Sequence, residues 1–231
     1  MGKRTKMAFT MLELIMVIVV LGILASLAIP RMERDLRQEG ADNILSAIRF
    51  TQHMALSDNV NENTNSKWHR KFWRFGKQGC SDNGIFYSIG SDKDMGGNID
   101  TLMGEAAIDP SNGMVINGQN TQPCESDLSG QSFTIPVVGR VNASSNIFLT
   151  KKYGILENDE AMFAGCPNTT DTLSIGFDYL GRPHRGFEDS DTPDYSTLMD
   201  TDCNLTFKFM DGSDDIIITI EAETGRAFQA Q

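Results

Sequence analysis

Histidine and the motifs of catalysis are scarce in this 231-residue chain. Its three histidines, His53, His69 and His184, are scattered along the sequence. The sequence contains no nucleophile elbow, no phosphate-binding loop and no GxGxxG dinucleotide motif. It therefore predicts a protein that is not an enzyme and that has no organic cofactor.

Positive charge is also scarce. Lysine and arginine number 20 against 31 acidic residues, which gives a net charge of −11. Three of the basic residues, Lys3, Arg4 and Lys6, precede the first apolar segment, and their loss would take the net charge from −11 to −14. Because phosphate groups would be repelled, the composition argues against a protein that coats nucleic acid or binds anionic membrane surfaces.

Charge of either sign is absent from residues 14–30. As a helix, the apolar segment 9–30 would rise about 33 Å, more than the bilayer's hydrocarbon core of about 30 Å. It is longer than the apolar part of a secretory signal, which has about 7–15 residues. The length favours a membrane anchor over a cleaved secretory signal.

Glu13 is the one charged residue near the start of this segment. A carboxylate at the centre of a membrane segment costs about 2.5–3.5 kcal/mol, so it should have a partner. The alternative is a position at interface depth, in a first helical turn whose dipole favours an acidic side chain.

The residues around Glu13 form a specific motif. AFTMLEL at positions 8–14, followed by an apolar helix with Gly22 and Pro30, resembles the class III leader of type IV pilins and type II secretion pseudopilins. The pattern of that family is a small residue, then Phe-Thr-Leu-x-Glu, then a long apolar stretch and a proline. Ala8 stands where the family usually has glycine.

The resemblance implies a route of processing and assembly. A prepilin peptidase would cut between Ala8 and Phe9 and methylate the new amine of Phe9. Glu13 would then pair with a Phe9 amine, within or between subunits, and set the axial register of each subunit. Gly22 and Pro30 would let the helix loosen between them, or are simply tolerated in a membrane helix.

The predicted fold class is α+β and pilin-like, with a long N-terminal helix, transmembrane and then amphipathic, packed on an antiparallel β-sheet head. Apolar residues at a spacing of three to four after Pro30 indicate the amphipathic part. The predicted domains are a leader (1–8), a transmembrane and polymerisation helix (9–30), an amphipathic helix (31–56) and a β-rich periplasmic head (57–231).

Short β-branched or aromatic runs bounded by turn residues predict the strands of the head. They lie at 68–75, 84–89, 114–116, 132–138, 146–150, 173–179, 205–209 and 216–222. The last two flank Asp211-Gly212 and should form a hairpin. The segments 38–49, 174–182 and 216–226 also resemble the GspH/FimT group of minor pilins and pseudopilins.

All four cysteines, Cys80, Cys124, Cys166 and Cys203, follow the apolar segment. They show no zinc-binding spacing, so an oxidising periplasm favours two disulfides over free thiols. Three pairings exist. Sequential pairing, Cys80–Cys124 and Cys166–Cys203, is favoured because each bond would close a long polar insertion.

Basic and aromatic residues interleave at 67–77, where five lysines and arginines accompany four aromatic residues. Aromatic rings can stack on bases while cations contact phosphates. The alternative is an ordinary amphipathic strand. The candidate DNA contacts are Arg70, Lys71 and Arg74, together with Arg182, Arg185 and Arg226 near two Gly-Arg turns of the kind through which some GspH/FimT members bind DNA.

An acidic loop at 92–100 is a weak calcium candidate. Its oxygen ligands would be Asp92, Asp94, Asn98 and Asp100, at spacings similar to part of a calcium-binding loop. Gly96 occupies one ligand position, which leaves the loop short of the six to eight oxygens that calcium prefers. The alternative is a solvated acidic loop.

The sequence thus predicts a minor pilin or pseudopilin of a type IV pilus or a type II secretion pseudopilus. Its expected location is the bacterial inner membrane, single-pass with a periplasmic head, and then the filament. Its expected partners are other pilins or pseudopilins, the prepilin peptidase and an inner-membrane assembly platform. One alternative is a tip subunit that captures DNA or an exported protein; another is an anchored protein that never polymerises.

Overall fold

The computed structural model describes residues 11–58, 65–100, 104–118, 120–125, 142–157, 162–167 and 173–230, without the side chains of 26–35. The chain divides into two compact units, Met1–Glu39 and Gly40–Gln231. The predicted cleavage residues Ala8 and Phe9 lie outside the described residues, as does the side chain of Pro30.

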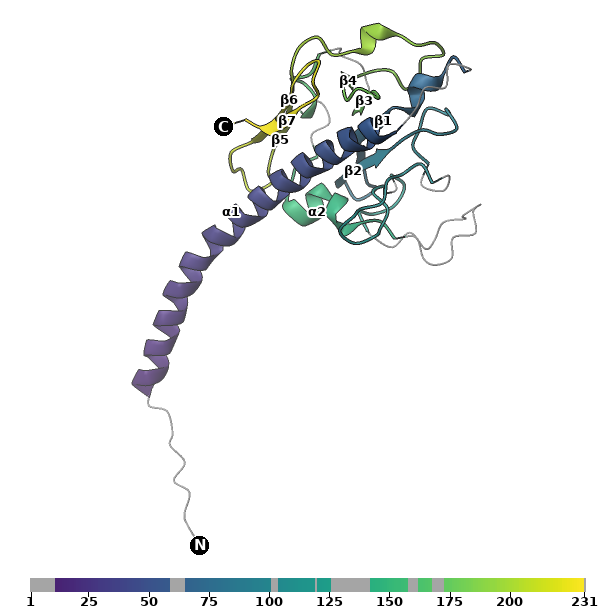
Figure 1. Cartoon of the computed structure of the whole chain (residues 1–231). Helices are drawn as coiled ribbons and strands as arrows, with labels where there is room; N and C mark the ends of the chain where they lie inside the picture. The colour runs from purple at the N-terminus through teal and green to yellow at the C-terminus, as the bar shows by residue number, and fades with distance from the viewer. Residues whose placement is uncertain are drawn as a thin grey trace. The chain divides into compact units, whose positions relative to one another are not determined.

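Helix α1 runs Met11–Ser57 (Figure 1). Over residues 11–24 its large apolar side chains are exposed, from 85% for Met11 to 48% for Val17. At Gly22 the helix surface is open, since a Cβ there would meet nothing within 4 Å. This part of α1 therefore presents an apolar surface without a covering layer from the described residues of its own unit.

The predicted fold class is wrong in two respects. In the part of the chain that the structure describes, no helix is long and apolar enough to cross a membrane. The head is also built on two antiparallel sheets rather than one.

The second unit begins with the remainder of α1, which is amphipathic. Ala41, Ile44 and Ile48 lie on its buried face, at the spacing of three to four residues that lines one side of a helix. They belong to the same core cluster as the apolar residues of both sheets. At Gly40 a Cβ would come within 3.2 Å of Tyr153, so the glycine lets α1 lie close to the Tyr153 side chain.

The first sheet has the strand order β2-β1-β3-β4, and all its pairs are antiparallel. On the central strand, Phe75 lies opposite Ile89 of β2 and Ile175 of β3, and all three are buried. The strands are β1 (Trp73–Gly79), β2 (Ile85–Gly90), β3 (Ser174–Phe177) and β4 (Pro183–His184).

The second sheet has the order β5-β6-β7 and lies near the C-terminus (Figure 1). β5 (Cys203–Phe207) and β6 (Ile216–Ile220) form the predicted antiparallel hairpin, with Leu205 opposite Ile218. β7 (Ala227–Gln229) adds an edge strand that the sequence did not indicate.

Two side chains of α1 fasten the helix to the last part of the chain. Arg49 donates through Nε and Nη2 to the Ala227 carbonyl, at 3.1 and 2.9 Å. The Gln52 amide donates to the carbonyls of Gly181 and Thr224, at 2.9 and 2.8 Å. These bonds give partners to one carbonyl at the start of β7 and to two turn carbonyls.

Other strand predictions are wrong or partly wrong. Residues 146–150 belong to two short helices separated by Phe148, which forms an isolated bridge with Phe86. Ser144 caps the first of these helices by accepting from the Asn146 amide. Residues 114–116 form only isolated bridges, and 132–138 lie outside the described residues. The short helices are η1 (Trp68–Lys71), η3 (Ser145–Ile147), α2 (Leu149–Tyr153) and η4 (Tyr195–Thr197).

The disulfide prediction is confirmed. Cys80 is bonded to Cys124 and Cys166 to Cys203, with Cα–Cα distances of 5.4 and 4.0 Å. The bonds join positions 44 and 37 residues apart. Each could stabilise the head by about 2–4 kcal/mol by restricting the unfolded chain.

The glycine at position 176 should be intolerant of a side chain. A Cβ there would overlap the ring of Phe187, which is buried, so Gly176→Ala should lower the free energy of unfolding by about 1–3 kcal/mol. Gly76→Ala is the matched control, because its Cβ would meet its nearest neighbours at 3.5 Å. Urea unfolding of both variants measures the difference, and equal midpoints would contradict the packing described.

Candidate functional site

The start of α1 carries a candidate assembly surface. Glu13, Met16, Val17, Val20 and Leu21 line a shallow hollow along one side of the helix. Their spacing of three and four places them on one face. Glu13 lies in the first turn of α1, where the helix dipole favours a carboxylate. An acid at one end of an apolar stripe can fix the register of a second helix against it.

Arg70, predicted as a DNA contact, instead joins two loops of the head. Its Nη1 donates to the Met95 carbonyl at 2.9 Å, and its Nε and Nη2 donate to the carbonyls of Ser190 and Asp189 at 2.9 and 2.8 Å. Its Nη2 also pairs with the Asp191 carboxylate at 3.1 Å. With only 7% of Arg70 exposed, this guanidinium supports the fold.

The other predicted DNA contacts are also held by the protein. Arg74 and Arg185 are buried, and Arg185 lies over the ring of Phe163. Lys71 is half-buried. Arg182 and Arg226 form ion pairs with Asp178 and Glu221, at 2.7 and 2.8 Å. Contact with phosphate would require these groups to leave their present partners.

Two of the six predicted contacts do lie near one another. The turns Gly181-Arg182 and Gly225-Arg226 meet at Gln52, whose amide binds a carbonyl in or next to each. A Cβ at Gly225 would collide with the Gly181 carbonyl, so glycine is required for this approach. Gly225 also has a φ of +67°, a conformation that side chains disfavour.

A second cavity, of about 280 Å³, is lined by aromatic rings and by the Asp178 network. The Asp178 carboxylate accepts from Arg182 Nε at 2.7 Å and lies 3.4 Å from His184 Nε2. Burial alone would raise the pKa of Asp178, but hydrogen bonds from His184 and Arg182 outweigh it and lower the pKa. Since these groups satisfy one another, they fix the turn between β3 and β4.

The acidic loop brings together part of the predicted calcium set. Carboxylate oxygens of Asp92, Asp94 and Glu105 lie within 4.8 Å of one another, whereas Asp100 is outside this group. The Asn98 amide donates to the Asp100 carboxylate at 3.4 Å. Glu105 was missed because it follows the loop in sequence. Backbone amides already donate to both oxygens of Asp92 and of Glu105.

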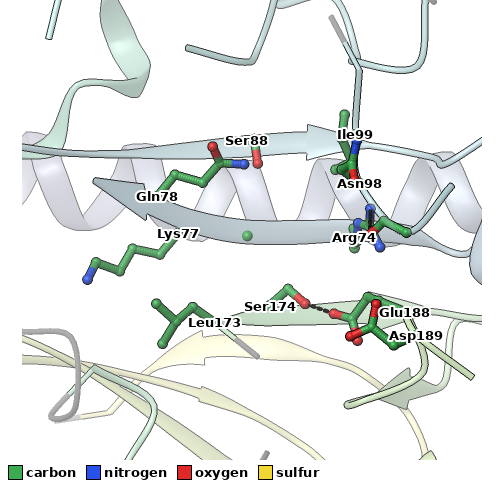
Figure 2. A pocket seen from close by; sticks show the side chains of 12 residues that line it. Arg74, Lys77, Gln78, Ser88, Asn98, Ile99, Leu173, Ser174, Glu188 and Asp189 are labelled. Atoms are coloured by element: carbon green, nitrogen blue, oxygen red, sulfur yellow. Dashed lines mark hydrogen bonds between the residues drawn. The ribbon is translucent and has the colours of Figure 1, made fainter. Parts of the chain in front are cut away.

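A hollow of about 250 Å³ on the first sheet is a third candidate (Figure 2). It lies over the central strand β1, between Ser88 of β2 and Ser174 of β3. Arg74 and Glu188 line it, and Ser174 donates to Glu188. Sequence reasoning missed this hollow, because the signal is the pairing of small residues across three strands.

Comparisons of the chain with protein-family models, with curated proteins and with solved structures found no match.

His69 should make the stability of the head depend on pH. Burial lowers its pKa, partly offset by the Ser190 carbonyl, to which Nε2 lies at 3.0 Å. The unfolded chain then takes up the proton first, so the free energy of unfolding should fall as the pH drops below about 6.5. His69→Gln should reduce this slope, with exposed His53→Gln as the control in urea titrations from pH 7.5 to 5. If the change of stability with pH is the same in His69→Gln, another group causes the pH dependence.

Proposed function

We propose that the chain is a minor pilin or pseudopilin of a type IV pilus or a type II secretion pseudopilus. A prepilin peptidase cuts it between Ala8 and Phe9, and it assembles through its N-terminal helix. The observation that carries the proposal is the exposed apolar surface at the start of α1, directly after the AFTMLEL motif. An apolar surface of this extent calls for a partner.

The hollow that begins at Glu13 supports helices of other subunits as that partner. Met16, Val17, Val20 and Leu21 offer only apolar surface, which a second apolar helix can cover. Glu13 would be costly to bury among such helices unless an opposite charge reaches it. The Phe9 amine created by cleavage supplies that charge, in the same subunit or in a neighbouring one.

The head supports an extracytoplasmic location. Its two disulfides are of the kind that forms in an oxidising compartment such as the periplasm. The subunit would accordingly be recruited at the bacterial inner membrane with its head in the periplasm. Its partners would be the peptidase, an assembly platform and the other pilins or pseudopilins.

The alternative of a tip subunit that captures DNA has less support. Arg70, Arg74 and Arg185 are buried, and the net charge is −11. The two Gly-Arg turns joined by Gln52 bring two arginines near one another, but both of these arginines are ion-paired.

Replacing Glu13 tests the proposal. Glu13→Gln keeps the size of the side chain and removes the charge that would pair with the Phe9 amine, so the variant should be cleaved but excluded from filaments. Glu39→Gln, an exposed acid on the same helix, is the matched control. The measurements are the amount of subunit in sheared filaments and the N-terminal mass of the mature chain.

Three results would count against this proposal. A mature chain that still carries residues 1–8 would leave no Phe9 amine to pair. Normal assembly of Glu13→Gln would show that this carboxylate sets no register, and a subunit that never enters filaments would be an anchored protein.

We also propose that the acidic loop binds calcium. Support comes from the convergence of Asp92, Asp94 and Glu105, whose oxygens suit a hard cation. Calcium at about 100 times its Kd should raise the free energy of unfolding by about 2.7 kcal/mol. Glu105→Gln should abolish this gain in stability, whereas Asp191→Asn, at an exposed acid, should keep it. Urea unfolding measures the gain. An equal gain in both variants would contradict a calcium site at this loop.

A further inference from the structure

The hollow in Figure 2 exists because the first sheet has small residues at the centre of one face. Gly76 of β1 lies opposite Ser88 of β2 and Ser174 of β3. A Cβ at Gly76 would meet only Ser174 Cβ and Ser88 Oγ at 3.5 Å, with the Leu173 carbonyl at 3.8 Å. No other described element fills the space above this glycine.

The same face is filled at its neighbouring glycines. A Cβ at Gly90 would collide with Ile99, and one at Gly176 with Phe187. Side chains from loops therefore occupy the positions on either side of the hollow. The empty space over Gly76 is thus a local feature of the fold rather than a general lack of packing on this face.

Two buried charged groups border this space (Figure 2). Arg74 is 4% exposed; its Nη2 donates to the Gly97 carbonyl at 3.1 Å, but its Nη1 has no hydrogen-bond partner among the described residues. Glu188 is 6% exposed; one oxygen accepts from Ser174, and Oε2 has no partner in the same part of the chain. A buried charge with an unused donor or acceptor is costly.

The charges of the lining select the kind of ligand. Arg74 is cationic and Glu188 is anionic, so the space is bordered by one buried charge of each sign. Neither a simple anion nor a simple cation would satisfy both unused atoms. A molecule that carries a carboxylate and an ammonium group can satisfy both, through charge-assisted hydrogen bonds.

We propose that this hollow binds a small zwitterion, a free α-amino acid with an aliphatic side chain. Its carboxylate accepts from Arg74, and its ammonium donates to Glu188. Ile99 and Leu173 supply the apolar part of the lining. The volume of about 250 Å³ lies just below the range of about 300–1,000 Å³ for typical ligand pockets, as a small ligand requires. The site is independent of how the subunit assembles.

Sugars fit the site less well. No aromatic ring is present among the lining residues, so a sugar ring would have no stacking surface. A hydroxyl group is uncharged, so its hydrogen bonds with Arg74 and Glu188 would be weaker than those of a carboxylate and an ammonium group. A neutral polyol is therefore the competing ligand that the experiment has to exclude.

The test is isothermal titration calorimetry on the full chain in mild detergent, with L-leucine as the probe. N-acetyl-L-leucine lacks the ammonium group and L-leucinamide lacks the carboxylate. Each derivative should bind at least about tenfold more weakly than L-leucine, because each loses one charge-assisted pair. Glu188→Gln should weaken the binding of L-leucine by a similar factor without changing the affinity for N-acetyl-L-leucine.

A steric variant separates binding from folding. Gly76→Val fills the hollow, and its β-branched side chain suits a strand, so it should abolish binding while the urea midpoint stays as in the parent. Gly79→Val, on the same strand but outside the lining, is the matched control and should bind L-leucine normally.

Three results would overturn the proposal. The first is no heat of binding with L-leucine at millimolar concentration. The second is undiminished binding in Gly76→Val. The third is displacement of L-leucine by an equal concentration of D-glucose, which would show that hydroxyl groups suffice for the site.

Discussion

The antiparallel register of β1 with both of its neighbours is the constraint on which the head depends. It sets Phe75 against Ile89 and Ile175, and one residue later it sets Gly76 against Ser88 and Ser174. Because side chains alternate between faces, the same register builds the apolar core and the hollow behind it. A slip of one residue would turn these serines toward the apolar core and the core residues toward the other face.

Elements with a strong local signal could be predicted from the sequence. The hairpin around Asp211-Gly212 and the two disulfides were predicted from turn residues, alternation and cysteine order. The short helices within 146–150 were not predicted. A short apolar run fits helix and strand alike, and here the cap by Ser144 favours a helix. The prediction of a single sheet was wrong, because the pairing of strands that are far apart in the chain leaves no local pattern in the sequence.

In the candidate sites too, the sequence shows some of the residues, and only the fold shows what they contact. The basic segment at 67–77 was visible in the sequence, but the role of Arg70 depends on carbonyls about 120 positions later. Glu105 joins Asp92 and Asp94 only through the fold. In an acidic chain, buried arginines thus serve mainly to hold loops, and a basic run by itself does not identify a surface for phosphate.

The contacts of Arg49 and Gln52 have a mechanical consequence. These two side chains tie α1 to the Ala227 carbonyl at the start of the last strand and to the turns at Gly181 and Thr224. Tension applied to the head along α1 would therefore be shared by four hydrogen bonds that stretch together, and it would enter both sheets at once. Such an attachment resists detachment of the helix better than bonds that break one after another.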